Sequence, residues 1–159
     1  MNKITFTIIL LVFAGYVIFQ GIKRFQLGSM NTALHKKDSD TLERLADMGI
    51  SRKLLGNYVC DLYKLRGYYV AKETEKFEKT LLHMIETPYK NSADKKSFLE
   101  NYFHTFLLKG NRKYADWLLE AIKKTDDQAF IHYNELSYDV MLDERSRSEE
   151  RRVGKECRS

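Results

Sequence analysis

The sequence predicts an all-α protein in which an N-terminal transmembrane helix is followed by antiparallel helix-pair repeats, stacked as an α-solenoid. Three observations predict this fold. An uncharged apolar run covers residues 4–22, later segments resemble one another at intervals of 36 to 37 residues, and no segment alternates apolar and polar residues as strands do. The chain then divides into a flank 1–3, the helix 4–22, an incomplete repeat domain 23–146 and a tail 147–159.

The run from Ile4 to Ile22 has the length and composition of a membrane-spanning helix. Its 19 residues extend about 28 Å at 1.5 Å per residue. A segment this apolar crosses lipid only as a helix, because a helix satisfies its own backbone polar groups. The alternatives are a cleaved signal peptide, which needs a shorter apolar core and a small-residue cleavage site, and a buried soluble helix.

Basic residues beside this run predict its orientation. Lys3 precedes it, whereas Lys23 and Arg24 follow it at once. By the positive-inside rule, this bias places the repeat domain of a single-pass protein in the cytoplasm. Cys60 is the one cysteine before the tail, so the repeat domain has no internal disulfide.

The repeat is clearest between two segments, Tyr69–Glu86 and Phe106–Lys123, which align without a gap at an offset of 37. Ala33–Met48 fits the first of them at an offset of 36. The corresponding residues of the first two segments include Tyr69 with Phe106, Phe77 with Tyr114, Leu81 with Leu118, and Ile85 with Ile122. The helices that precede these segments repeat at the same offset, which pairs Leu62 with Leu99 and Leu65 with Tyr102.

Each repeat is expected to contain two helices. Gly110 ends the first helix of the better-defined pair, and Asp94 is expected to cap its start. Thr74 is expected to cap the second helix of the preceding pair. Pro88 and Asn91 place a turn between the two pairs.

This pattern resembles the tetratricopeptide-repeat family. The matching residues of the better-defined pair are Leu99, Phe103, Phe106, Gly110 and Ala115. Phe103 stands where the family prefers a small residue, and the preceding pair carries Glu73 and Glu78 at the turn and small-residue positions. The resemblance covers about residues 29–142 and implies a concave surface that binds other proteins. An irregular helical bundle remains the alternative.

No residue pattern indicates catalysis, a cofactor or a metal, so the sequence does not predict an enzyme. The four histidines lack ligand partners at zinc spacing, and the phosphate-binding glycine motifs and the nucleophile elbow are missing. Cys60 is expected to face the core, and Asp116 with Glu120 to form a solvated edge. The segment 67–72 is aromatic and basic, but Tyr69 aligns with a core position, so no nucleic-acid partner is expected.

Candidate partner-binding residues are Tyr68, Trp117 and Lys113. The two aromatic residues either face a groove and anchor a peptide, or pack in the core, which is the favoured interpretation. We therefore expect a membrane-anchored repeat protein that binds a protein or peptide near the bilayer, with no small-molecule substrate. The alternatives are an accessory or regulatory subunit of an envelope or secretion complex, recognised through its transmembrane helix, and the N-terminal part of a larger enzyme.

The C-terminal segment Arg147–Ser159 resembles a sequencing adapter translated in frame, with agreement over the eleven residues that begin at Arg147. It is therefore expected to be non-native and disordered. Without it, the net charge falls from +5 to +3 and Cys157 is removed. The third helix pair keeps only its first helix, from Phe130 to about Asp143, which predicts that the natural protein continues.

Overall fold

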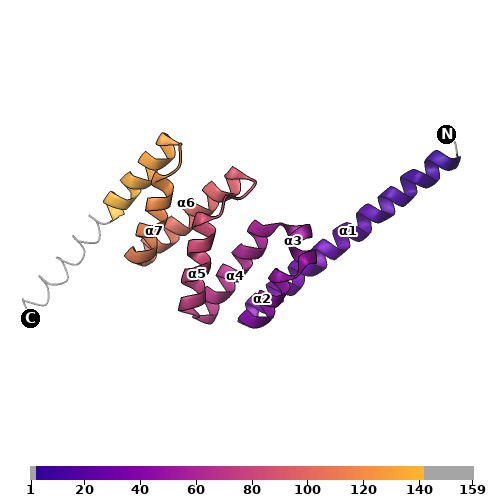
Figure 1. The fold of residues 1–159 in the computed structure, drawn as a ribbon, viewed down its shortest axis with the longest axis horizontal. Helices are drawn as coiled ribbons and strands as arrows, with labels where there is room; N and C mark the ends of the chain where they lie inside the picture. The colour runs from indigo at the N-terminus through magenta and orange to yellow at the C-terminus, as the bar shows by residue number, and fades with distance from the viewer. Residues whose placement is uncertain (1–2, 142–159) are drawn as a thin grey trace, which may run out of the picture. The chain divides into compact units, whose positions relative to one another are not determined.

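The computed structural model describes residues 3–141, which form helices and short turns without a strand (Figure 1). The chain divides into two compact units, Met1–Thr87 and Pro88–Ser159, and each is described by itself below. An all-helical protein with a long apolar N-terminal helix is therefore confirmed. The tail 147–159 and the expected truncation lie outside the described residues.

Unit 1 contains five helices (Figure 1). They are α1 (Lys3–His35), α2 (Ser39–Asp47), α3 (Gly49–Leu55), α4 (Asn57–Ala71) and α5 (Thr74–Glu86). Helix α1 passes without a break through position 22, where the apolar run ends, and continues for more than three turns. Lys23 and Arg24 end the run but not the helix, because both are good helix formers.

The core of unit 1 forms where α2 and α4 pack on the C-terminal part of α1. Met30, Ala33, Leu42, Ala46 and Cys60 make one buried cluster. Cys60 therefore faces the core as expected, and burial raises the pKa of its thiol.

Helix α4 approaches α2 closely at Gly67. A Cβ atom at this position would lie 2.4 Å from Leu42 Cδ2. The glycine therefore permits the two helices to pack at this distance.

Two features of unit 1 differ from the expectations. Helix α3 was not predicted, because seven residues are too short to show a helical period. Thr74 does not cap α5: it is the first helical residue, and Glu73 holds the cap position. The Glu73 carboxylate instead accepts a hydrogen bond from Ser39 and pairs with Lys76 at 3.0 Å, so it ties α5 to the start of α2.

Unit 2 contains α6 (Ser92–Lys109), α7 (Arg112–Lys123) and a helical segment at 128–141. The predicted turn at Gly110 is confirmed: its φ is 73°, and its N–H donates to the Leu107 carbonyl. Asn111 then caps α7 by accepting from the Tyr114 N–H. Asp94 does not cap α6, because Asn91 begins the helix and accepts from the Ala93 N–H.

The first helices of the pairs α4–α5 and α6–α7 correspond at an offset of 38 residues, not at the predicted 37. Tyr69 is 42% exposed, whereas Phe106, its expected equivalent, is 2% exposed. Buried residues match when Cys60 is set against Phe98, Leu65 against Phe103, and Tyr68 against Phe106. For α5 and α7 the offset of 37 pairs Phe77 with Tyr114, which are both buried. An offset of 38 also pairs the buried residues of α5 with buried residues of α7: Phe77 with Ala115, Leu81 with Leu119, and Met84 with Ile122. The turns correspond at an offset of 38 as well, because α4 ends at Ala71 and α6 at Lys109, and the cap positions of α5 and α7 are Glu73 and Asn111.

The segment 128–141 packs against both helices of unit 2. The Lys96 ammonium of α6 lies 4.6 Å from the centre of the Phe130 ring and 2.5 Å from Asp127, which directly precedes the segment. The Tyr138 hydroxyl donates to Asp116 of α7 at 2.5 Å. Asp116 therefore has a structural partner. Leu136 and Val140 are exposed, as expected for a helix whose apolar face is not covered within the described residues.

Candidate functional site

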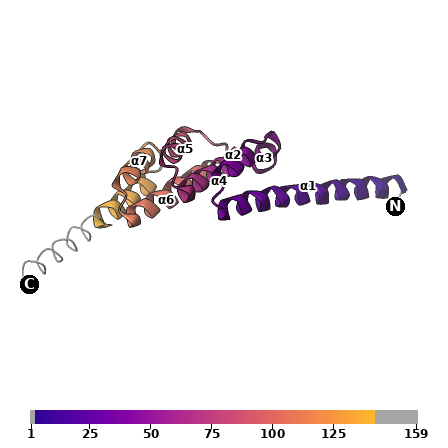
Figure 2. The same cartoon turned by 90° about the horizontal axis from the view of Figure 1, so that it is seen from below.

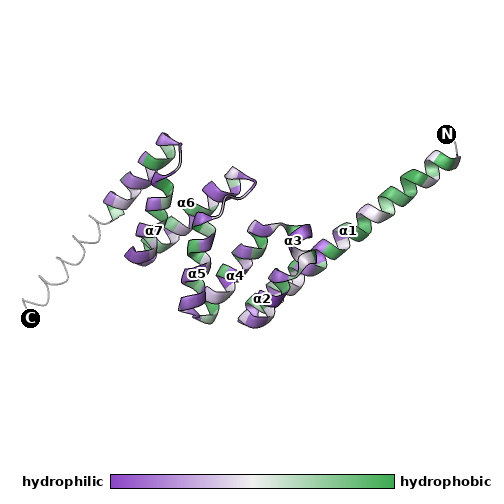
Figure 3. Ribbon diagram, viewed as in Figure 1, coloured by the Kyte–Doolittle hydropathy of each residue, from purple (hydrophilic) through white to green (hydrophobic). Residues whose placement is uncertain are grey.

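Helix α1 is long and apolar enough to cross a membrane. None of its most apolar stretch is buried inside the protein, so it does not have the surroundings of a soluble core helix. Figure 3 shows this difference along α1, which is strongly hydrophobic toward its N-terminus and mixed where α2 and α3 lie beside it.

Tyr68 lies at a pocket of about 410 Å³ in unit 1, formed by residues of α2 to α5. We call it the Tyr68 pocket; its lining includes Glu43, Asp61, Lys64, Tyr68, Lys76 and His83. The tyrosine itself is 3% exposed, which confirms its interpretation as a core residue. Burial raises its pKa, and so does a hydrogen bond to the Glu43 carboxylate, so its hydroxyl stays protonated at neutral pH.

Charged side chains surround Tyr68. The Lys76 ammonium lies 5.4 Å from the centre of its ring and 3.5 Å from a Glu43 carboxylate oxygen. The exposed Lys79 also lines the pocket. The rim therefore offers cations and hydrogen-bonding groups around a ring that is itself almost fully buried, and such a rim suits contact with a polar peptide.

Another set of ion pairs lies at the end of the pocket that Arg52, Asp61 and Lys64 line. Arg52 of α3 reaches Asp47 at 2.7 Å and the buried Asp61 at 3.3 Å, and Lys64 reaches Asp47 at 3.0 Å. Partial burial opposes ionisation of Asp47, but the hydrogen bonds from Arg52 and Lys64 outweigh it and lower the pKa of Asp47. This network joins α2, α3 and α4.

The charged residues of the pocket do not form a metal site. Among residues 3–141, no group of three or more histidine, cysteine, aspartate or glutamate side chains could hold a metal ion. His83 approaches Asp61 at 3.9 Å and is largely exposed.

The other two candidate residues lie together on α7 in unit 2. The Lys113 ammonium is 5.0 Å from the centre of the Trp117 ring and 5.7 Å from that of Tyr114. Trp117 is half-buried, and its ring centre lies 5.7 Å from that of Tyr114. Trp117 is therefore partly open to a partner and partly packed. Tyr68 belongs to unit 1.

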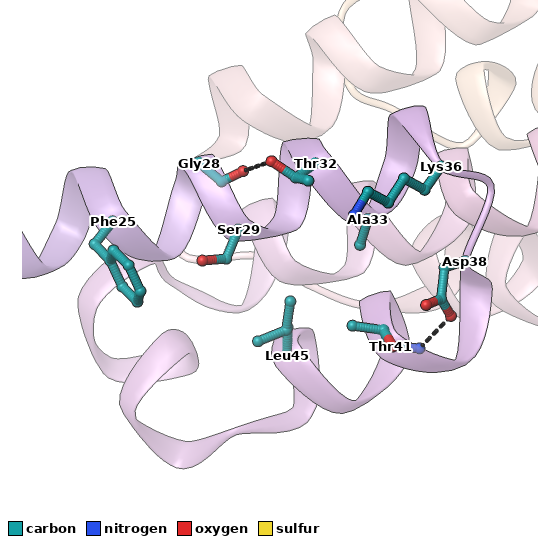
Figure 4. Close-up of a pocket in the computed structure, with 9 residues that line it drawn as sticks. All are labelled: Phe25, Gly28, Ser29, Thr32, Ala33, Lys36, Asp38, Thr41 and Leu45. Atoms are coloured by element: carbon teal, nitrogen blue, oxygen red, sulfur yellow. Dashed lines mark hydrogen bonds between the residues drawn. The ribbon is translucent and has the colours of Figure 1, made fainter.

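The sequence did not predict a groove between α1 and α2, of about 510 Å³ (Figure 4). Phe25 and Gly28 line it from α1, and Leu45 lines it from α2. Thr41 donates its N–H to Asp38 at 3.0 Å at the far end of the groove. One signal for this surface was present in the sequence: Phe25, a large apolar residue, follows directly after two basic residues.

No family model, curated protein or solved structure matches this chain. The resemblance to tetratricopeptide repeats therefore rests on the residues themselves.

Proposed function

We propose that this chain is a membrane-anchored helical protein that binds a protein or peptide close to the bilayer. Helix α1 supplies the anchor, and the helix pairs α4–α5 and α6–α7 supply the binding surfaces, arranged as tetratricopeptide-like repeats. The proposal places the repeats in the cytoplasm, on the basis of Lys23 and Arg24.

One observation carries the proposal: α1 is a single continuous helix with two different environments. Its apolar N-terminal stretch has no protein around it, whereas Met30 and Ala33, further along the same helix, are buried against α2 and α4. A helix of this kind fixes a folded unit directly at the membrane surface, without a linker.

The Tyr68 pocket is the preferred site for the partner in unit 1. Its rim presents Lys76 and Lys79 beside the buried Tyr68. A preformed charged rim on packed helices binds an extended peptide at a low entropic cost. Trp117 with Lys113 offers a second contact of the same chemistry in unit 2.

Photo-crosslinking from the full chain in native membranes tests this proposal. A photoreactive residue at Lys79 should capture a protein, whereas the same residue at Leu82 should not. Both positions are exposed on α5, but only Lys79 lines the pocket. Equal capture from the two positions, or none from either, would count against the pocket as the binding site.

Replacing residues 4–22 with an unrelated apolar helix distinguishes this proposal from the alternative, in which a partner recognises the transmembrane helix itself. If the Lys79 crosslink survives the exchange, the folded part of the chain carries the binding. If it is lost while the chain stays in the membrane, the helix itself is recognised.

A further inference from the structure

We propose that α3, together with Met48 before it, is a second membrane contact that lies in the lipid headgroup layer next to α1. The inference rests on the proposed function, because it requires α1 to cross the bilayer. It assigns a role to the one helix of unit 1 that the repeat pattern does not explain.

The depth of α3 follows from its attachment to α1. The Ser51 hydroxyl donates to the Gln26 side-chain oxygen at 3.5 Å, and Ser51 is fully buried between the helices. Gln26 lies four residues beyond Ile22, where the uncharged run ends. Four residues of helix rise about 6 Å, and the headgroup region of one leaflet is about 5 to 8 Å thick. Ser51 therefore lies at the depth of the headgroups.

The path of the chain gives the same placement. After α1 ends at His35, α2 turns back along it, so that Leu45 lies in one groove with Phe25 and Gly28 (Figure 4). The chain then reaches α3, at the end of unit 1 nearer to the apolar half of α1, before α4 leads away. Figures 1 and 2 both show α3 on this side of α2.

Apolar side chains at this end of unit 1 are only partly covered by the protein. Met48 is 44% exposed, Ile50 is 48% exposed, and Phe25 on the adjoining part of α1 is 72% exposed. Burying such side chains in the headgroup and acyl boundary removes their apolar surface from water, as interfacial helices do.

The charges around these apolar residues favour an anionic lipid surface. Lys23, Arg24 and Lys53 make no ion pair within the described part of the chain. The nearby acidic residue Asp47 is already paired with Arg52 and Lys64. Three unneutralised cations beside exposed apolar side chains match the composition of segments that bind anionic membranes.

Quenching of a fluorescent label by nitroxide lipids tests the placement. The full chain with Cys157 replaced by serine is reconstituted in vesicles of phosphatidylcholine and phosphatidylglycerol that carry a headgroup nitroxide. A single label is placed at Ile50→Cys, Val12→Cys or Val70→Cys; Cys60 stays, because it is fully buried. Val12 lies in the apolar run, and Val70 lies at the opposite end of α4.

We expect the label at position 50 to be quenched strongly by the headgroup nitroxide and the label at position 70 to be unaffected. Acyl-chain nitroxides should quench the label at position 12. If the label at position 12 is quenched but the labels at positions 50 and 70 are quenched to the same extent, the proposal is overturned and the membrane anchor remains. Failure of quenching at position 12 would overturn the anchor itself, and with it the role of α3.

The charge requirement has its own test in the same vesicles. One cation near an anionic surface contributes about 1 kcal/mol, which is about a fivefold change in equilibrium. Lys53→Gln should therefore lower the ratio of quenched to unquenched label at position 50 by about fivefold, whereas Lys79→Gln should not change it. Equal effects of the two substitutions would refute the contribution of Lys53.

Discussion

Substitution of Gly67 by alanine tests the packing of α4 against α2. The new Cβ would lie 2.4 Å from Leu42 Cδ2, and Leu42 is 1% exposed, so its side chain has little room to move. Overpacking of this kind costs about 1 to 3 kcal/mol. Alanine also returns about 1 kcal/mol of helix propensity. We therefore expect a net loss of about 1 kcal/mol in the free energy of unfolding of unit 1.

A double-mutant cycle with Leu42→Ala makes this test specific. Leu42→Ala alone should cost about 2 to 5 kcal/mol, because it leaves a cavity. In that background the clash is absent, so Gly67→Ala should stabilise by about 1 kcal/mol, which gives a coupling of about 2 kcal/mol. Gly28→Ala is the matched control, because a Cβ there meets nothing within 4 Å.

Hydrogen exchange of the α2 and α4 amides, measured by mass spectrometry, reports the stability of unit 1 separately from that of unit 2. If Gly67→Ala slows the exchange of these amides equally in the wild-type and the Leu42→Ala backgrounds, α4 does not approach α2 closely at Gly67.

Three further substitutions test the ion pairs and caps. Asp61→Ala leaves Arg52 without its buried partner. Because Arg52 is partly exposed, we expect the stability of α3 and α4 to fall by roughly 1 to 2 kcal/mol, measured by hydrogen exchange. Unchanged exchange in these helices would contradict this. The pKa of Asp47 is lowered in the folded state, so its contribution to stability is present at neutral pH and is lost as the pH falls below about 4. Acid unfolding monitored by circular dichroism should accordingly be less pH-dependent in Asp47→Asn, and an unaltered profile would refute that role. Asn111→Ala should destabilise α7 by about 1 kcal/mol through loss of its cap, and α7 exchange should change far less in Asp94→Ala, which removes no cap.

Local signals predicted much of the helical layout. Gly110 was predicted to end a helix because glycine adopts a positive φ without strain, and it does so at 73°. In the equivalent turn of unit 1, Lys72 takes a φ of 62°, which its sequence does not indicate. The packing of α4 and α5 imposes that conformation on an ordinary residue.

The first-helix register could not be read from the alignment. Tyr68 and Tyr69 are adjacent and chemically identical, so sequence alone does not decide which of them faces the core. Packing decides: Tyr68 is buried beneath the Lys76 ammonium and hydrogen-bonds to Glu43, whereas Tyr69 is 42% exposed. The prediction that Tyr69 occupies a core position is therefore wrong.

The candidate site was predicted only in part. Lys113 and Trp117 lie in contact, as residues four positions apart on a helix do. The Tyr68 pocket depends on Arg52 and Asp61, whose meeting requires α3, a helix too short to be predicted.

Alkaline carbonate extraction of membranes, followed by intact mass measurement, tests the central claim most directly. The claim is that α1 crosses a membrane and also belongs to the core of unit 1. It predicts that the chain stays in the membrane pellet with residues 4–22 still attached. Release of the chain into the supernatant, or a mature protein without residues 4–22, would contradict it.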